Sequence, residues 1–186
     1  MAETPLETMV AGIETLLAGT DDMSAIVAGV VRLARPLAED TSWIGRDLYA
    51  TDDDQGFGVT ALYVAADDGL LVETVCWAPG RGVAPHDHKT WGVVVGLDGE
   101  EINVDWRRLD DGTRDGHAEL ETARELAIRR GVAATFLPDD IHSVRNDGAE
   151  PSLSLHIYGR NLANINRSEF DPVNNIQRPC PKRSRR

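Results

Sequence analysis

Two histidines one residue apart, His86 and His88, are the first residues in this sequence whose types and spacing suggest chemistry. They follow a Gly/Pro-rich turn and precede an apolar run, in the stretch VAPHDHKTWGVVVG. Alternate side chains of an extended chain share a face, so both imidazoles are expected to project together while Asp87 points away. Two imidazoles on one face suggest a metal ion.

His142 is the third candidate ligand. It ends the stretch FLPDDIH, a strand-turn-strand pattern that would return its side chain to the same end of a barrel. Three neutral imidazoles suit Fe, Cu, Ni or Zn and leave coordination positions open for substrate. The alternative, a surface H-x-H pair, is disfavoured by the Pro-Gly turn before it and the PDDIH stretch after it. His117, in a polar loop, is not expected to be a ligand.

A second polar set lies in the stretch SLSLHIYGRN. On a strand, Ser154, His156 and Tyr158 share one face, whereas Leu153, Leu155 and Ile157 share the other. The apolar set can be buried against a core. The polar set is then either a solvated face or a group of residues with a function of its own.

The elements that must position these residues begin with two helices. Apolar residues recur at helical spacing between Pro5 and Glu39, and Thr20–Asp22 predict a break and an N-cap between the two segments. The second helix ends either at Pro36 or at the stretch EDTSW. The simplest role for the helices is to cover one end of a barrel.

The rest of the chain predicts many short strands separated by turn signals. The expected strands are Val59–Ala65, Leu70–Trp77, Trp91–Gly96, Ile102–Trp106, Glu119–Ile128, Val132–Leu137, His142–Arg145 and Leu153–Tyr158. By propensity, Glu119–Ile128 is equally compatible with a helix. The pattern indicates a mainly β sandwich or barrel. We expect one domain, with a helical segment over residues 1–40, the barrel over 41–171 and a C-terminal tail over 172–186 that ends in a solvated, frayed PKRSRR.

The composition excludes some classes of partner. The formal net charge of −12 argues against binding to nucleic acid or to an anionic membrane, since both depend on Lys and Arg. The chain contains no apolar run of membrane-spanning length and no signal peptide, and it has two cysteines, Cys76 and Cys180. We expect a cytoplasmic protein in which Cys76 is a buried free thiol. The Glu100 and Glu101 pair follows a turn and is expected on a solvated edge.

The spacing of these motifs resembles the cupin superfamily, whose fold is a small double-stranded β-helix barrel. G(x)5HxH at Gly80–His88, glycine at Gly96 and P-x-x-x-H at Pro138–His142 resemble its two metal-binding motifs. Many cupins carry a glutamate ligand shortly after H-x-H, where this chain has KTWGVV. The resemblance therefore implies a three-histidine site, typical of the thiol dioxygenases.

Thiol dioxygenases of the cysteine dioxygenase type carry a Ser-x-His-x-Tyr relay beside the iron, which Ser154, His156 and Tyr158 match. The sequence also resembles the bacterial members of that family, including 3-mercaptopropionate dioxygenases, in the stretches CWAPG, PHDH and TWGVVVGLDGEE. This resemblance covers roughly Tyr63 to Asp171. Animal members form a thioether bond between the tyrosine and a cysteine on the strand after H-x-H. Val93 occupies the corresponding place, so that bond is not expected.

The resemblance implies an enzyme that uses Fe(2+) to add both atoms of O2 to the sulfur of a small thiol, 3-mercaptopropionate or cysteine, giving a sulfinate. The early strand GVTALYVA has no arginine for the substrate carboxylate. Arg167 matches the position of the arginine in 3-mercaptopropionate dioxygenases, and Arg160 is a nearer competitor. The metal ligands would be His86, His88 and His142.

Two other functions remain open from the sequence. One is a non-catalytic, metal-binding cupin that senses or stores a small ligand. The other is a different cupin metalloenzyme, such as a zinc or nickel isomerase or an oxygenase for a non-thiol acid. The sequence does not distinguish a monomer from a small homo-oligomer.

Overall fold

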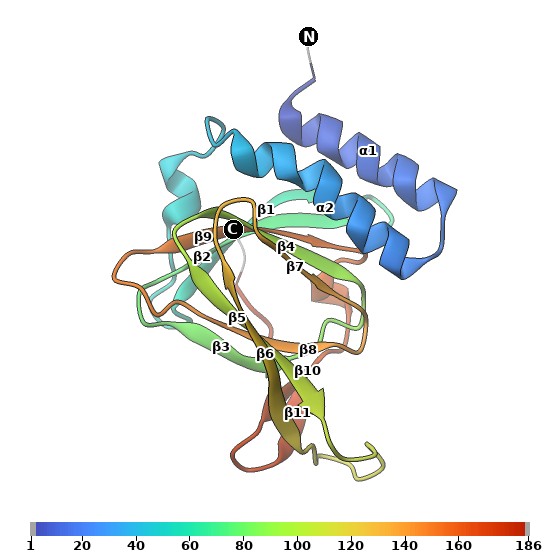
Figure 1. Cartoon of the computed structure of the whole chain (residues 1–186), viewed down its shortest axis with the longest axis vertical. Helices are drawn as coiled ribbons and strands as arrows, with labels where there is room; N and C mark the ends of the chain where they lie inside the picture. Colours follow the sequence, from blue (N-terminus) through green and yellow to red (C-terminus); the bar gives the residue numbers. More distant parts are fainter. Residues whose placement is uncertain (1–2, 185–186) are drawn as a thin grey trace.

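Two antiparallel sheets and two N-terminal helices make up the computed structural model, which describes residues 3–184 (Figure 1). One sheet has the strand order β1-β2-β9-β4-β7 and the other β11-β10-β3-β8-β5-β6. The strands are β1 Phe57–Val64, β2 Leu71–Trp77, β3 Gly82–His86, β4 Gly92–Asp98, β5 Glu101–Arg108, β6 Leu120–Ile128, β7 Ala133–Phe136, β8 Ile141–Arg145, β9 Ser152–Tyr158, β10 Ser168–Asp171 and β11 Ile176–Pro179. This confirms the predicted mainly β barrel of the double-stranded β-helix type.

The two helices are α1, Pro5–Gly19, and α2, Met23–Glu39. The side chain of Asp22 caps α2 by accepting hydrogen bonds from the first turn, as the sequence predicts. Pro36 lies inside α2, and the backbone N–H of Asp40 donates to the carbonyl of Pro36. Of the two predicted ends of this helix, the EDTSW stretch is therefore the correct one.

Both helices lie on the outer face of the five-stranded sheet, where α2 contacts β4 and β7 (Figure 1). The largest apolar core forms there, between the buried faces of the helices and the outward side chains of β2, β4 and β9. Cys76 belongs to this core as a free, buried thiol. The opposite face of the same sheet is turned toward the second sheet and is available for polar side chains.

All eight predicted strands are present, with ends that shift by one or two residues. The ambiguous Glu119–Ile128 segment forms β6, because it pairs along its length with β5 in an antiparallel hairpin. That pairing supplies hydrogen bonds and cross-strand contacts that outweigh the helix propensity of its Glu, Leu, Ala and Arg residues.

Three strands were not predicted: β3, β10 and β11. Pro85 interrupts β3, and the pairing of β3 with β8 shifts register between Val83 and His86. A proline lacks the N–H for a regular ladder, so this stretch does not have a strand-like sequence. The polar strands β10 and β11 pair with each other, and β10 also contacts β3 next to His86.

The C-terminal segment lies against the barrel. The guanidinium of Arg183 donates to Glu169 at 3.1 Å and stacks over Phe57, and the backbone of Ser184 donates to Gln55. Over residues 181–184 the predicted frayed tail is thus held by specific contacts. Residues 1–2 of the predicted helical segment and residues 185–186 of the predicted tail lie outside the described residues. Between residues 3 and 184, no helix has the length and apolar character needed to cross a bilayer.

Candidate metal centre

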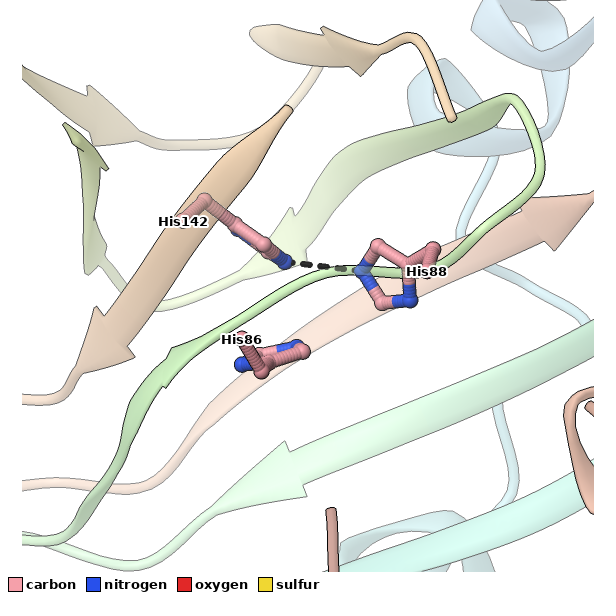
Figure 2. Close-up of side chains that lie close together, drawn as sticks. All are labelled: His86, His88 and His142. Atoms are coloured by element: carbon pink, nitrogen blue, oxygen red, sulfur yellow. Dashed lines mark hydrogen bonds between the residues drawn. The ribbon is translucent and has the colours of Figure 1, made fainter. Parts of the chain in front are cut away.

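The structure brings the three predicted ligand histidines together (Figure 2). His86 ends β3, His88 follows in the loop to β4, and His142 comes from the neighbouring strand β8, where it lies opposite His86. One ring nitrogen from each lies within 4.8 Å of the others, and the Nε2 atoms of His88 and His142 are 2.8 Å apart. His88 and His142 are buried and His86 is half-buried.

Hydrogen bonds fix the ring orientation of two of these histidines. The amide nitrogen of Asn103 donates to Asp105 at 2.7 Å, so the Asn103 oxygen faces Nδ1 of His142, also at 2.7 Å. Nδ1 of His86 lies 3.0 Å from the carbonyl of Ala84. Because both acceptors are oxygens, Nδ1 of each ring must bear the hydrogen, and the lone pair of each ring is on Nε2.

The donor set fits a metal ion. Burial lowers the pKa of His86 to about 4 and that of His88 and His142 well below the usual value, so all three rings are neutral at pH 7. Nδ1 of His88 is buried with no hydrogen-bond partner among the described residues. A cation that accepts the lone pairs of His88 and His142 would relieve the close approach of their Nε2 atoms. The group therefore fits a mononuclear metal site.

The polar face of β9 forms a continuous chain of buried hydrogen bonds beside this centre. Nδ1 of His156 lies 2.8 Å from the hydroxyl of Tyr158, and its Nε2 lies 3.0 Å from the hydroxyl of Ser154. The Tyr158 ring packs against that of His88 with centroids 4.7 Å apart. Burial lowers the pKa of His156 to about 3, which leaves it neutral and able to accept one hydrogen and donate another.

Glu101 extends this chain, which the sequence did not indicate. Its Oε2 lies 2.9 Å from the Ser154 hydroxyl, and the residue is 1% exposed, so the predicted solvated edge is wrong for Glu101. Burial raises its pKa to about 8, and the Ser154 hydroxyl and Trp77 indole, which favour the ionised form, offset only part of this shift. Glu100, next to it, is exposed as predicted. The alternation of β5, which places Glu101 and Asn103 on one face, is the signal that could have identified both.

A cavity of about 1080 Å³ opens onto the histidines and onto Tyr158. Arg167 lines it, and this guanidinium helps to lower the pKa values of the three candidate ligands, so it is near them. Arg160 is exposed and is not among the lining residues, so the structure does not bring it to the site. Glu73, a buried acid opposite His156 on β2, also lines the cavity and was not anticipated.

Gly92, and not Val93, is the residue of β4 beside the relay tyrosine. Gly92 pairs with Tyr158, and a Cβ atom at Gly92 would lie 2.9 Å from its ring. Val93 pairs with Ile157 and is buried in the core under the helices. Because neighbouring side chains of a strand point to opposite faces, the sequence-based placement of Val93 at the thioether position is wrong by one residue. Neither residue is a cysteine.

The family model for cysteine dioxygenase type I matches residues 19–171. This range includes the three histidines, Arg167 and the four hydrogen-bonded residues Glu101, Ser154, His156 and Tyr158.

Several solved structures are similar to this chain at low sequence identity. An oxalate oxidase in complex with the substrate analogue glycolate is 22% identical, with a TM-score of 0.48 over 60% of this chain and 54% of that one. The present chain thus spans about half the length of that protein. TT1209 from Thermus thermophilus is 21% identical, with a TM-score of 0.46 over 62% and 92% of the two chains. A double-stranded beta-helix protein from Klebsiella pneumoniae is 15% identical, with a TM-score of 0.45 over 77% and 100%.

Proposed function

We propose that this chain, which belongs to the cysteine dioxygenase type I family, is an iron thiol dioxygenase that adds both atoms of O2 to the sulfur of a small thiol. The substrate is a thiol that bears a carboxylate, 3-mercaptopropionate or cysteine, and the product is the sulfinate. The main support is that three neutral imidazoles and a buried Ser-His-Tyr chain meet at one cavity. The compartment that we propose is the cytoplasm, where Cys76 and Cys180 would stay reduced, as they are here.

His86, His88 and His142 would hold the iron. A bound iron(II) ion would supply redox chemistry with O2 and would favour the thiolate form of the substrate. Five residues of one buried apolar cluster line the cavity and would exclude water from the reacting sulfur: Phe57, Val59, Val75, Trp77 and Val144.

Arg167 would bind the carboxylate of the substrate. Its side chain has no hydrogen-bond or ion-pair partner in the range 3–184, and it lines the cavity near the histidines. A planar guanidinium can bind a carboxylate through two parallel hydrogen bonds, which would orient the thiol toward the metal. The exposed position of Arg160 favours Arg167 over this competitor.

More basic than acidic side chains line the cavity, although the chain has a formal charge of −12. The basic residues are Arg108, Arg114, Arg167, Arg178, Lys182 and Arg183, and the acidic ones are Glu73 and Asp115. Glu169 pairs with Arg178 and Arg183, and Asp110 pairs with Arg108. The remaining positive charge would attract small anions, which supports an acidic thiol as substrate.

Oxygen uptake by the iron(II)-loaded protein tests this proposal. The panel should include 3-mercaptopropionate, cysteine, propionate as a control without sulfur, and 2-mercaptoethanol as a control without a carboxylate. We expect one sulfinate to form per O2 consumed with a thiol acid and none with propionate. No oxygen uptake with any thiol at full iron occupancy would exclude the dioxygenase.

Tyr158→Phe tests whether the relay takes part in turnover. Loss of the hydroxyl should lower kcat by about 10²- to 10⁴-fold, the range for a group that holds or transfers a proton in the transition state. Iron content should stay the same, because the phenol is not one of the grouped donor atoms. A variant with the wild-type kcat would show that the Tyr158 hydroxyl and its hydrogen bonds to His156 and Ser154 take no part in turnover.

A further inference from the structure

Glu101 ends a row of three hydrogen bonds that begins at Tyr158. The bonds link Tyr158 to His156 at 2.8 Å, His156 to Ser154 at 3.0 Å and Ser154 to Glu101 at 2.9 Å. All four side chains are 3% exposed or less. A row of this kind can transfer one proton over its whole length without any side chain leaving its place.

Among residues 3–184, no basic side chain pairs with Glu101. The Ser154 hydroxyl of β9 hydrogen-bonds its carboxyl group, the indole of Trp77 on β2 lies near it, and apolar Ile128 of β6 lies opposite it. The titratable group that it influences is the thiol of Cys76, whose pKa burial raises to about 11, so this thiol is neutral near pH 8. No charged side chain contributes to the shift of Glu101. The carboxyl group can therefore be protonated or ionised near neutral pH.

When Glu101 is protonated, every bond in the row points toward the cavity. The carboxylic acid donates to the Ser154 oxygen, the Ser154 hydroxyl donates to Nε2 of His156, and Nδ1–H donates to the Tyr158 oxygen. His156 is then the Nδ1–H tautomer. Tyr158 keeps its own hydrogen for a group in the cavity.

When Glu101 is ionised, every bond reverses. The Ser154 hydroxyl donates to the carboxylate, Nε2–H of His156 donates to Ser154, and the Tyr158 hydroxyl donates to Nδ1. His156 is then the Nε2–H tautomer. Tyr158 now presents a lone pair to the cavity in place of a hydrogen.

We propose that Glu101 is a positioning residue that sets, by holding or losing one proton, whether Tyr158 donates or accepts a hydrogen bond in the cavity. The transfer is balanced. Tyr158 gives its hydroxyl proton to an acceptor in the cavity and receives the proton of His156 Nδ1. Nε2 of His156 receives the hydroxyl proton of Ser154, and Ser154 receives the carboxyl proton of Glu101, whose O–H bond breaks. One proton leaves Glu101, one reaches the cavity, and no electrons move. The catalytic meaning of this switch rests on the proposed function, but the switch itself does not.

The tautomer of His156 is the direct readout. Nitrogen-15 NMR of the full chain loaded with Zn²⁺, which is diamagnetic, reports which ring nitrogen bears the hydrogen. In the wild type we expect His156 to change from the Nδ1–H to the Nε2–H form as the pH rises through about 8. Glu101→Gln keeps the shape of the side chain but cannot ionise, so its His156 signal should not change over that range.

The pH profile of turnover is the second readout. If the donor form of Tyr158 is the active one, wild-type kcat with the best thiol falls by up to about tenfold per pH unit above pH 8, whereas KM stays constant. Glu101→Gln should remove this alkaline limb. Ser154→Ala, which interrupts the row but leaves Glu101 in place, should remove it as well. Glu100→Gln, an exposed neighbour on the same turn, should keep the wild-type profile.

The outcomes separate the two proposals. A His156 tautomer that does not change with pH in the wild type, or that changes equally in Glu101→Gln, overturns the role of Glu101 whatever the activity. A wild-type protein that shows the tautomer change but oxidises no thiol retains the switch and excludes the dioxygenase. If Glu101→Gln does not fold, the Ser154→Ala variant decides, because an unchanged alkaline limb in that variant rules out transfer along the row.

Discussion

The two faces of strand β9 differ completely in what they bury. Leu153, Leu155 and Ile157 point outward into the core beneath the helices, and each is 1% exposed or less. The residues between them, Ser154, His156 and Tyr158, point inward and are equally buried, but they are satisfied by hydrogen bonds to one another and to Glu101.

The apolar face of β9 therefore contributes mainly to stability, and the polar face mainly to the proposed chemistry. Burial of the aliphatic face stabilises the fold by the transfer of apolar surface from water. The polar face gives little net stability, since each buried hydrogen bond mainly offsets the desolvation of its own groups. A change on the outer face should therefore lower stability and leave turnover intact. A change on the inner face should mainly lower turnover, with a cost in stability of about 1–3 kcal/mol for a buried group left without its partner.

The largest effect is expected on the inner side, from the metal centre. His88→Ala removes a central member of the three-imidazole group, so iron binding and oxygen uptake should both fall below detection. The circular dichroism spectrum should remain that of the wild type, because the core under the helices is unchanged. His117→Ala, in a loop outside the group, is the matched control and should keep its iron. Stoichiometric iron in His88→Ala would show that the three rings do not form the site.

On the outer face, Leu155→Ala should lower the free energy of unfolding by about 2–5 kcal/mol, because it leaves a cavity in a fully buried position. Urea denaturation measures this loss. The rate per folded, iron-loaded molecule should equal that of the wild type. Ile157→Val, a smaller deletion on the same face, should cost about 0.5–1.5 kcal/mol. A fall in kcat as large as that of Tyr158→Phe would show that the two faces are not independent.

The sequence predicts both faces of β9, because strict alternation of polar and apolar residues distinguishes the two sides of a strand. It also predicts the three histidines, since H-x-H places two rings together and the PDDIH turn brings back a third. These predictions depend on local patterns that the tertiary structure preserves.

The parts that were missed depend on which strands become neighbours. Glu101 follows a turn, as an exposed residue often does, and it is buried only because β5 lies between β8 and β6 with Ser154 opposite. Strands β10 and β11 are short and polar, and they are strands only because they pair with each other and with β3. The confusion of Val93 with Gly92 has the same origin, since only the register of β4 on β9 shows which residue faces Tyr158.

A smaller effect is expected from Asn103, which orients His142 from outside the metal group. Asn103→Ala removes the acceptor for Nδ1–H, so the ring loses its fixed tautomer, and metal affinity should fall by about 10- to 100-fold. Competition with a chelator of known affinity measures this change. Asn103→Asp keeps an acceptor for Nδ1–H but also turns a second carboxylate oxygen toward Asp105, to which the amide nitrogen donates at 2.7 Å in the wild type, so it should restore only part of the affinity. Wild-type affinity in Asn103→Ala would mean that packing alone holds the ring.

The two faces of β9 should also differ in how they respond to acid. The pKa of His156 is about 3 in the folded chain, against about 6.5 for an exposed imidazole in the unfolded chain. Between these values the unfolded chain binds more protons, so the free energy of unfolding decreases as the pH falls from about 6.5 toward 3. His156 contributes at most about 1.4 kcal/mol per pH unit to this slope.

Urea denaturation of the metal-free protein between pH 4 and 7 should therefore give a shallower slope for His156→Gln than for the wild type. Leu155→Ala should lower the whole curve and keep the wild-type slope, because no proton binds to the outer face. Equal slopes in His156→Gln and the wild type would mean that His156 is not held neutral by burial.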